Sequence, residues 1–265
     1  MKLTISHVTR YDYDAPVDYA LQQVRLTPQP TPQQSIVRWE LNVDGGRVET
    51  SYTNHYGAHV DLVSADRGTT SISITAKGEI ETADTAGVVG RCGGPAPLWV
   101  YQSQTAQTTP GPFIEALADP LRQATDTLSE LHSLSASILD AAPYVIGRTY
   151  AETSAEAALA GQSGVCQDHA QIFVSAARCA GIPARYVSGY LMMNDRVDQE
   201  ASHAWAEAHV DGLGWVGFDV SNGISPDERY VKLAVGLDYR QAAPISGVRM
   251  GTAGESLIVS LQIEQ

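Results

Sequence analysis

Apolar and polar residues alternate in short runs over the first 85 residues, and this pattern restricts that part of the chain to β-structure. The clearest run covers residues 37–43 and ends at the turn sequence Asp44-Gly45-Gly46. Similar runs occur at residues 3–5, 24–27, 60–63 and 70–76. Successive side chains of a strand point to opposite faces, so each run can bury one face. We therefore predict an N-terminal antiparallel β-sandwich domain over residues 1–85.

A different pattern follows. Residues 86–112 are rich in Gly and Pro, which indicates a linker. Beyond them, Leu131, Leu134 and Ile138 recur at helical spacing after a capping pattern at Thr127. A second capping pattern at Thr153 precedes a short helix, and a longer helix is expected from about residue 166 to residue 180.

Strand patterns return after this helix, at residues 185–191, 201–210 and 215–220, with two more in the tail at 230–237 and 256–263. The predicted class is therefore α+β, with one central helix packed on an antiparallel sheet. We assign residues 113–265 to this second domain, together with its C-terminal strands.

Composition excludes several partners. The net charge is −13, which disfavours nucleic acid and anionic membrane surfaces. No stretch approaches the ~18 apolar residues that a membrane span requires. The three cysteines show no paired spacing, and no apolar export segment follows Met1, so we expect a cytoplasmic location. A disulfide between Cys92 and Cys179 remains an open alternative.

One cysteine has the surroundings of a nucleophile. Cys166 follows Gly164 and stands at the predicted start of a helix. Unpaired backbone N–H groups and the positive end of the helix dipole favour a thiolate there. The Cys166 N–H could also help to hold an oxyanion. The alternative is a buried structural cysteine, and Cys179 on the same helix illustrates it.

A histidine and an aspartate follow in the order that thiol catalysis needs. His203 opens a strand whose alternation places Trp205 on the same face. Asp219 ends the next strand. If Val210 faced Trp215, the carboxylate of Asp219 would point away from His203. A three-residue loop (211–213) or a bulge at Gly214 would instead set Asp219 opposite Trp205, and we predict this second register.

The predicted catalytic residues are thus Cys166, His203 and Asp219. Weaker predictions place Gly164, Trp205 and Trp215 at the substrate-binding wall of the site. The neighbours Asp168 and His169 are expected on a solvated helix face or as a supporting pair. Zn²⁺ on the three catalytic side chains is an alternative, but no HxH, HExxH or CxxC spacing supports it. We expect no metal and no cofactor.

At these residues the chain resembles the bacterial transglutaminase-like superfamily, whose core is similar to papain-type cysteine proteases. The resemblance rests on residues 164–168, 181–190, 202–205 and 214–219, and on N-terminal residues including His7, Tyr11, Tyr13 and Arg25. It implies a papain/transglutaminase-like core in which Cys166 is the nucleophile, His203 the base and acid, and Asp219 the orienting group. Two departures stand out: His169 replaces a usual Phe, and residues 220–222 replace the common Pro-Thr-Asn.

The resulting prediction is a thiol enzyme that attacks an amide or peptide bond through a thioester, with a peptide or protein as substrate. Hydrolysis by a cysteine peptidase or amidase is the first expectation. Two alternatives stay open: a protein-glutamine transglutaminase that uses the same triad, and a non-catalytic binding module with a vestigial triad.

Overall fold

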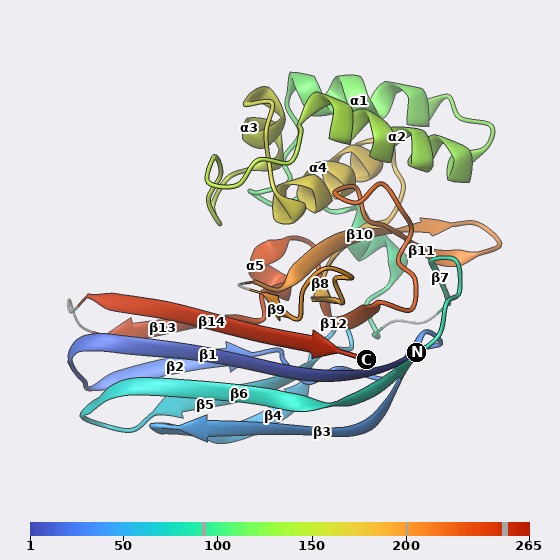
Figure 1. Ribbon diagram of the computed structural model, residues 1–265. Coiled ribbons are helices and arrows are strands. Elements are labelled where there is room, and N and C mark those ends of the chain that lie inside the picture. The colour runs from blue at the N-terminus through green and yellow to red at the C-terminus, as the bar shows by residue number, and fades with distance from the viewer. Residues whose placement is uncertain (92–93, 200, 251–253) are drawn as a thin grey trace.

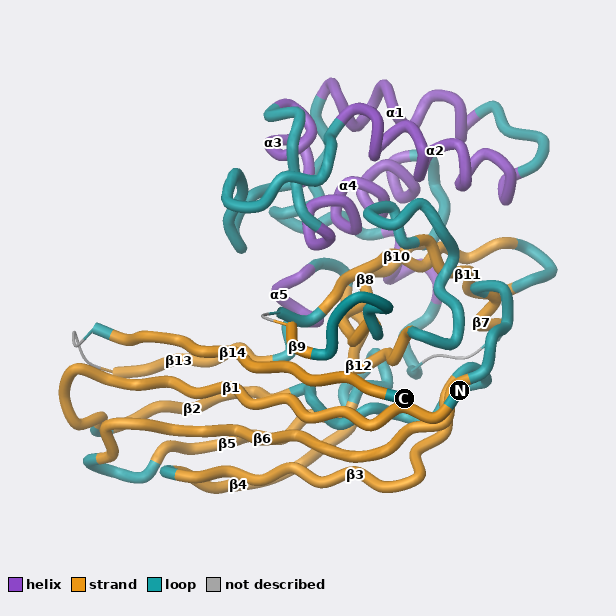
Figure 2. The backbone as a smooth tube through the Cα atoms, in the orientation of Figure 1, coloured by secondary structure: helices purple, strands orange, loops and turns teal. Residues whose placement is uncertain are grey.

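A computed structural model describes residues 1–91, 94–199, 201–250 and 254–265, which form a β-sandwich, a second antiparallel sheet and a helical layer. Figure 1 shows these three layers, with α1–α4 on one side of the second sheet and the sandwich on the other. The strands gather in the sandwich and the middle layer (Figure 2). The α+β prediction, with an N-terminal sandwich and a papain/transglutaminase-like core, is confirmed.

The sandwich consists of two sheets. The first has the order β3 (Gln34–Asp44), β6 (Thr69–Thr82), β1 (Lys2–Val17), β14 (Glu255–Glu264) and β9 (Asp198–Gln199). The second has the order β13 (Ile245–Met250), β2 (Tyr19–Val24), β5 (His59–Ala65) and β4 (Gly46–Thr53). Alternate β1 residues such as Leu3 and Ile5 are fully buried between them. The alternating sequence pattern is the cause, because it supplies each strand with one apolar face.

The C-terminal strands correct one part of the expected organisation. Residues 245–265 were grouped with the catalytic core, but β14 pairs with β1, from Thr4 opposite Glu264 to Tyr13 opposite Glu255. β13 pairs with β2 in the other sheet. The two chain ends therefore lie side by side in the sandwich (Figure 1). Hydrophobic period alone does not say which distant strand supplies the hydrogen-bonding partner.

The middle layer is the core sheet, in the order β12 (Tyr230–Gly236), β8 (Ala184–Leu191), β10 (His203–Val210), β11 (Gly214–Phe218) and β7 (Val88–Gly90). β7 and the 3-10 helix η1 (Leu98–Gln102) both come from the segment expected to be a linker. Tyr101 of η1 is buried in the core, so this segment is part of the packed domain.

The helical layer comprises α1 (Pro112–Arg122), α2 (Thr127–Ala141), α3 (Ala155–Ala160) and α4 (Cys166–Cys179), while the short α5 (Tyr239–Ala242) lies nearer the sandwich. α4 packs on β10 through small residues, since Ala206 and Ala208 form the helix-facing side of that strand. Phe173 of α4 stacks on Phe218 of β11 with ring centroids 4.9 Å apart. This contact fixes the helix, and with it Cys166, relative to the sheet.

The helix caps differ by one residue from the expected ones. Asp126, not Thr127, caps α2, and Ser154, not Thr153, caps α3. The carboxylate of Glu156 accepts hydrogen bonds from three backbone N–H groups at the start of α1, including that of Gly111 at 3.0 Å. It thereby satisfies donors that the helix itself leaves unpaired.

Candidate active site

Cys166 is the first residue of α4 and is half-buried. The carboxylate of Asp168 fixes this helix start, because its Oδ2 accepts the Val165 N–H at 2.8 Å and the Thr149 hydroxyl at 2.6 Å. Asp168 is itself 1% exposed, and burial raises its pKa. Of the two alternatives, a solvated helix face or a supporting pair, the solvated face is therefore wrong for this residue. It is a buried cap two positions from the sulfur.

Gly164 is required by packing. It is buried, and its carbonyl accepts the N–H of Val145. A Cβ at this position would lie 2.8 Å from Cβ of Asp168, too close for two carbon atoms. The glycine lets the helix cap close over the chain that leads to Cys166. Room for the Asp168 side chain explains the glycine, and its place at the substrate-binding wall stays a prediction.

His203 and Asp219 meet as the second register predicts. β10 and β11 pair with Val210 opposite Gly214 and His209 opposite Trp215, around a turn at residues 211–213. Gly214 has φ of +83°, a conformation that glycine adopts readily. The same register brings Asp219 level with Trp205, and His203 Nε2 lies 2.6 Å from Asp219 Oδ2. The register prediction is confirmed.

The protonated state of His203 is stabilised by its two neighbours. Burial alone would lower the pKa of the imidazole, but hydrogen bonds with Asp219 and Cys166 and the charges of both groups outweigh it. Together they raise the pKa of His203 to about 10. Since Nε2 faces Asp219, Nδ1 is the ring nitrogen left for the Cys166 thiol. The order of the three side chains across the site is therefore sulfur, imidazole, carboxylate, with the imidazole bonded to the carboxylate through Nε2.

Asp219 is fully buried and surrounded by donors. Besides His203, its Oδ2 accepts from the Tyr230 hydroxyl at 2.7 Å and from Asn222 Nδ2 at 2.7 Å. Burial disfavours the charged carboxylate, but the bonds to His203, Asn222 and Tyr230 prevail and lower its pKa. Sequence reasoning missed the role of Tyr230, which is the first residue of β12. Asn222 carried a local signal, because an amide three residues after an aspartate can fold back on it.

The two tryptophans differ in position. Trp205 stacks beside His203 with ring centroids 6.4 Å apart and is 3% exposed. Trp215 lies opposite His209, and the guanidinium of Arg185 sits 4.0 Å from its ring centroid. It is 4% exposed and packs in the core, away from Cys166. The structure brings Trp205 to the triad and does not bring Trp215 there.

His169 is also placed differently from the expectation of a solvated face. It is 1% exposed, and its Nε2 lies 2.7 Å from the carbonyl oxygen of Ala142. A carbonyl only accepts, so Nε2 carries the proton and Nδ1 accepts the Ser221 hydroxyl at 2.8 Å. Burial lowers the pKa of His169, which keeps it neutral. His169 thus links the Cys166 helix to the turn that follows Asp219.

The other cysteines lie apart from this site. Cys179, at the far end of α4, is half-buried, and its sulfur lies 3.0 Å from Nη2 of Arg122. Cys92 falls outside the described residues, and with it the expected alternative of a Cys92–Cys179 bridge.

The residue after the nucleophile is bonded outside the triad: the side-chain amide of Gln167 donates to the carbonyl oxygen of Ala151.

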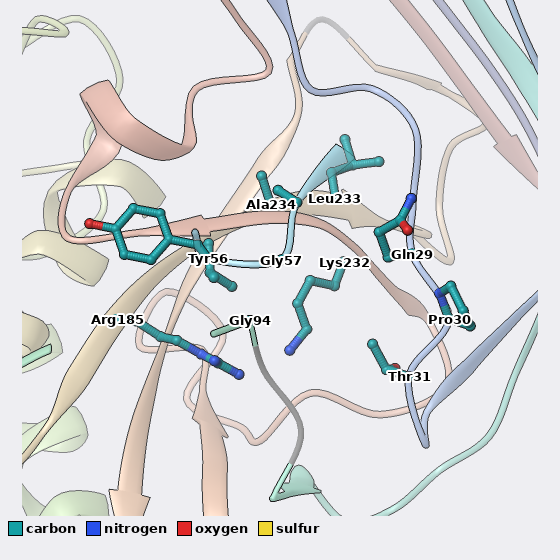
Figure 3. Close-up of a pocket in the computed structure, with 12 residues that line it drawn as sticks. Gln29, Pro30, Thr31, Tyr56, Gly57, Gly94, Arg185, Lys232, Leu233 and Ala234 are labelled. Carbon is teal, nitrogen blue, oxygen red and sulfur yellow. The ribbon is translucent and has the colours of Figure 1, made fainter. Parts of the chain in front are cut away.

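A separate pocket of about 130 Å³ lies on β12 and contains no member of the triad. The side chains of Arg185 and Lys232 converge on it (Figure 3). Both are already bound to Glu207, at 2.7 Å from Arg185 Nε and 2.5 Å from Lys232 Nζ. Glu207 is fully buried. These charges therefore form an internal ion cluster that ties β8, β10 and β12 together.

Metal ligands and membrane-spanning helices also bear on function. Residues 1–91, 94–199, 201–250 and 254–265 contain no group of three or more His, Cys, Asp or Glu side chains arranged to hold a metal ion. Within the same ranges, every helix is too short or too polar to cross a bilayer.

Comparisons with known proteins agree with this geometry. Residues 115–220 match the transglutaminase-like superfamily, and residues 3–81 match the bacterial transglutaminase-like N-terminal region. The first match contains Cys166, His203 and Asp219, and the second spans β1 through β6 of the sandwich. The chain belongs to the transglutaminase-like superfamily, with the N-terminal region found in its bacterial members.

Individual relatives are similar to this chain over different shares of its length. An uncharacterized protein of Mycobacterium leprae is 26% identical over 99% of this chain and 98% of its own length. A protein-glutamine gamma-glutamyltransferase of Pseudomonas aeruginosa is 30% identical over 52% of this chain and 23% of that protein. The crystal structure of a candidate cysteine protease from Cytophaga hutchinsonii superposes with a TM-score of 0.78 at 21% identity, over 100% of this chain and 91% of that one. It shares the fold.

Proposed function

We propose that this protein is a cysteine-nucleophile enzyme that cleaves an amide or peptide bond through a thioester, acting first as a peptidase or amidase. The observation that carries the proposal is the line from Cys166 through His203 to the buried carboxylate of Asp219, with 2.6 Å between His203 Nε2 and Asp219 Oδ2. A raised pKa lets His203 hold the proton that the thiol gives up.

Each residue has a defined step. The Cys166 thiolate attacks the carbonyl carbon, and the carbonyl π electrons move to oxygen to form an oxyanion. The Cys166 backbone N–H, one of those that a helix leaves unpaired in its first turn, is a donor for that oxyanion. When the C–N bond breaks, His203 gives its proton to the leaving amine, and a thioester remains.

Water completes the cycle. His203, now neutral, takes a proton from water as the oxygen attacks the thioester, and the thiolate leaves with the carboxylic acid as product. Asp219 keeps the imidazole in one orientation throughout and stabilises its charged form. Tyr230 and Asn222 in turn hold that carboxylate. A peptide or protein is the proposed substrate, and the cytoplasm the proposed location.

Transglutamination is the second candidate. One observation favours it: the Pseudomonas aeruginosa relative named as a protein-glutamine gamma-glutamyltransferase is 30% identical over 52% of this chain. The first half-reaction is the same, with the glutamine carboxamide as acyl donor and ammonia as leaving group. The second differs only because a primary amine, and not water, attacks the thioester.

One experiment separates these activities. A glutamine-containing peptide is incubated with the protein, with and without a fluorescent primary amine, and the products are read by mass spectrometry. Backbone cleavage or deamidation without amine incorporation is expected. Cys166→Ala should abolish the reaction, while Cys179→Ala, a matched change on the same helix, should retain it.

Other results would revise the proposal. Amine incorporation that exceeds hydrolysis would make the protein a transglutaminase. A screen of peptides and simple amides in which wild type and Cys166→Ala are equally inert would favour the binding-module alternative.

A further inference from the structure

A pocket of about 180 Å³ lies where the sandwich meets the catalytic core. Its lining includes His7 and Thr9 of β1, Val259 of β14, and Ser202 and Tyr239, which precede β10 and begin α5. Thr9 and Val259 are directly paired across the two strands. The pocket therefore combines residues from both ends of the sequence with residues of the core.

We propose that this pocket binds an apolar side chain of the substrate beside the amide that Cys166 attacks. This inference rests on the proposed function, because it assigns a specificity site to that reaction. The substrate class would be peptides, or acylated amines, with a branched aliphatic or aromatic residue next to the reacting bond.

Continuity with the catalytic residues supports this assignment. Ser202 directly precedes His203 in the chain, so the pocket begins one residue from the base. Tyr239 of α5 is partly buried against the same small cluster as Cys166. Figure 1 shows α5 beside the core strands β8 and β10, on the side of them that faces β14 of the sandwich. A substrate whose carbonyl reaches the sulfur thus has this pocket on the His203 and Tyr239 side.

The lining chemistry selects an uncharged group. Of the ten described residues around the pocket, none carries a charge at neutral pH. Among the described lining residues, His7 has the side chain that ordinarily titrates nearest to pH 7, and it lies 2.8 Å from the Tyr190 hydroxyl and 3.0 Å from that of Thr9. Burial lowers its pKa to about 4, so it is neutral near pH 7. A charged substrate group placed here would lose water without gaining an opposite charge from the described lining residues.

The apolar wall is also left open to a ligand. Leu257 lines the pocket and is 54% exposed. Val259, two residues further along β14, points to the same face and is partly exposed. Covering these side chains with a leucine or phenylalanine of the substrate would bury apolar surface on both partners.

Reactive probes test the pocket without knowledge of the natural substrate. Chloromethyl ketones of N-acetyl leucine, phenylalanine, aspartate and lysine are compared with chloroacetamide, which has no side chain. The rate of Cys166 alkylation is followed by peptide mapping. We expect the leucine and phenylalanine reagents to react on the order of tenfold faster than the aspartate and lysine reagents.

Two variants and a control locate the effect. Val259→Trp fills the pocket and should remove the preference for the apolar reagents. Ile258→Trp is the matched control, because residue 258 is 57% exposed and its side chain points to the opposite face of β14. Leu257→Arg changes an exposed position and should shift the preference toward the aspartate reagent. Far-UV circular dichroism checks that each variant is folded.

The outcomes separate the two proposals. Equal rates for all side chains, or a preference that survives both Val259→Trp and Leu257→Arg, would overturn the pocket assignment. Rapid labelling of Cys166 by chloroacetamide would leave the proposed function standing in that case. Labelling of Cys166 no faster than that of a cysteine in the denatured chain would overturn both.

Discussion

His169 Nδ1 and Ser221 Oγ lie 2.8 Å apart, and this hydrogen bond joins the helix that begins at Cys166 to the turn that follows Asp219. Both residues stand where the sequence departs from the usual family pattern, so the two departures are in contact. The bond couples the nucleophile's helix to the carboxylate's turn.

Removing one partner of this bond should lower the free energy of unfolding more than removing both partners. Ser221→Ala leaves the buried Nδ1 of His169 without a donor, and we expect a loss of about 1–3 kcal/mol in the free energy of unfolding. His169→Phe restores the common family residue. In a double-mutant cycle by urea denaturation, the double variant should be more stable than the sum of the single losses predicts. Strict additivity would show that the bond carries no coupling.

Tyr230 should act through Asp219. Tyr230→Phe removes the hydroxyl that donates to Asp219 Oδ2 and keeps the ring that packs on Trp205. The carboxylate retains His203 and Asn222, so we expect folding to persist with about 1–3 kcal/mol lower stability. A less constrained imidazole should reduce kcat/KM on the order of tenfold. Unchanged kinetics would exclude a positioning role for Tyr230.

The ion cluster around Glu207 should be structural. Glu207→Gln leaves the Arg185 and Lys232 cations in the core without their shared carboxylate, and we expect a loss of about 3–5 kcal/mol. Asp12→Asn is the control, because the Arg10–Asp12 pair at 2.8 Å is exposed to solvent and should contribute little to stability. Thermal melting of both variants measures the difference. Equal shifts in Tm would contradict the assignment.

Stability should depend on His203 in the alkaline range. Its pKa is raised to about 10 in the fold, against an ordinary value of 6.5. The native imidazole therefore holds a proton that the unfolded imidazole releases between these values, so the stabilisation from this residue alone is complete below about pH 6.5 and declines as the pH rises toward 10. The slope from this residue is at most about 1.4 kcal/mol per pH unit.

His203→Gln supplies the comparison for that slope. The urea concentration at half-unfolding is measured for both proteins at about pH 7, 8 and 9. The difference between wild type and variant should shrink as the pH rises, since the variant lacks the titrating group. Asp219 does not interfere, because its pKa is lowered and its contribution is lost only in acid. Parallel curves over this range would mean that the imidazolium does not stabilise the fold.

The parts of the site that could be predicted depend on neighbouring residues in the chain. Residues 211–213 and Gly214 determine the hairpin register, and the register determines that Asp219 reaches His203. The helix start at Cys166 follows from local pattern in the same way. The alternation of the first 85 residues predicted the sandwich, because a period of two admits one buried face.

The missed features come from segments that are distant in sequence. Tyr230 reaches Asp219 only after β12 pairs with β8, and nothing in the local sequence marks its hydroxyl. β14 returns to β1 for a similar reason. Asp168 and His169 look like polar surface residues until the helix is packed, since their partners Thr149, Ala142 and Ser221 come from three other segments.

The reactivity of Cys166 as a function of pH tests the central claim most directly. Iodoacetamide labelling, resolved for each cysteine by peptide mapping, is compared in wild type, His203→Ala and Asp219→Asn from about pH 6 to pH 8. The account predicts that wild-type Cys166 reacts faster across this range than a cysteine in the denatured chain, and that His203→Ala slows it to that ordinary rate. A Cys166 rate that is the same in wild type and His203→Ala across this range would contradict it.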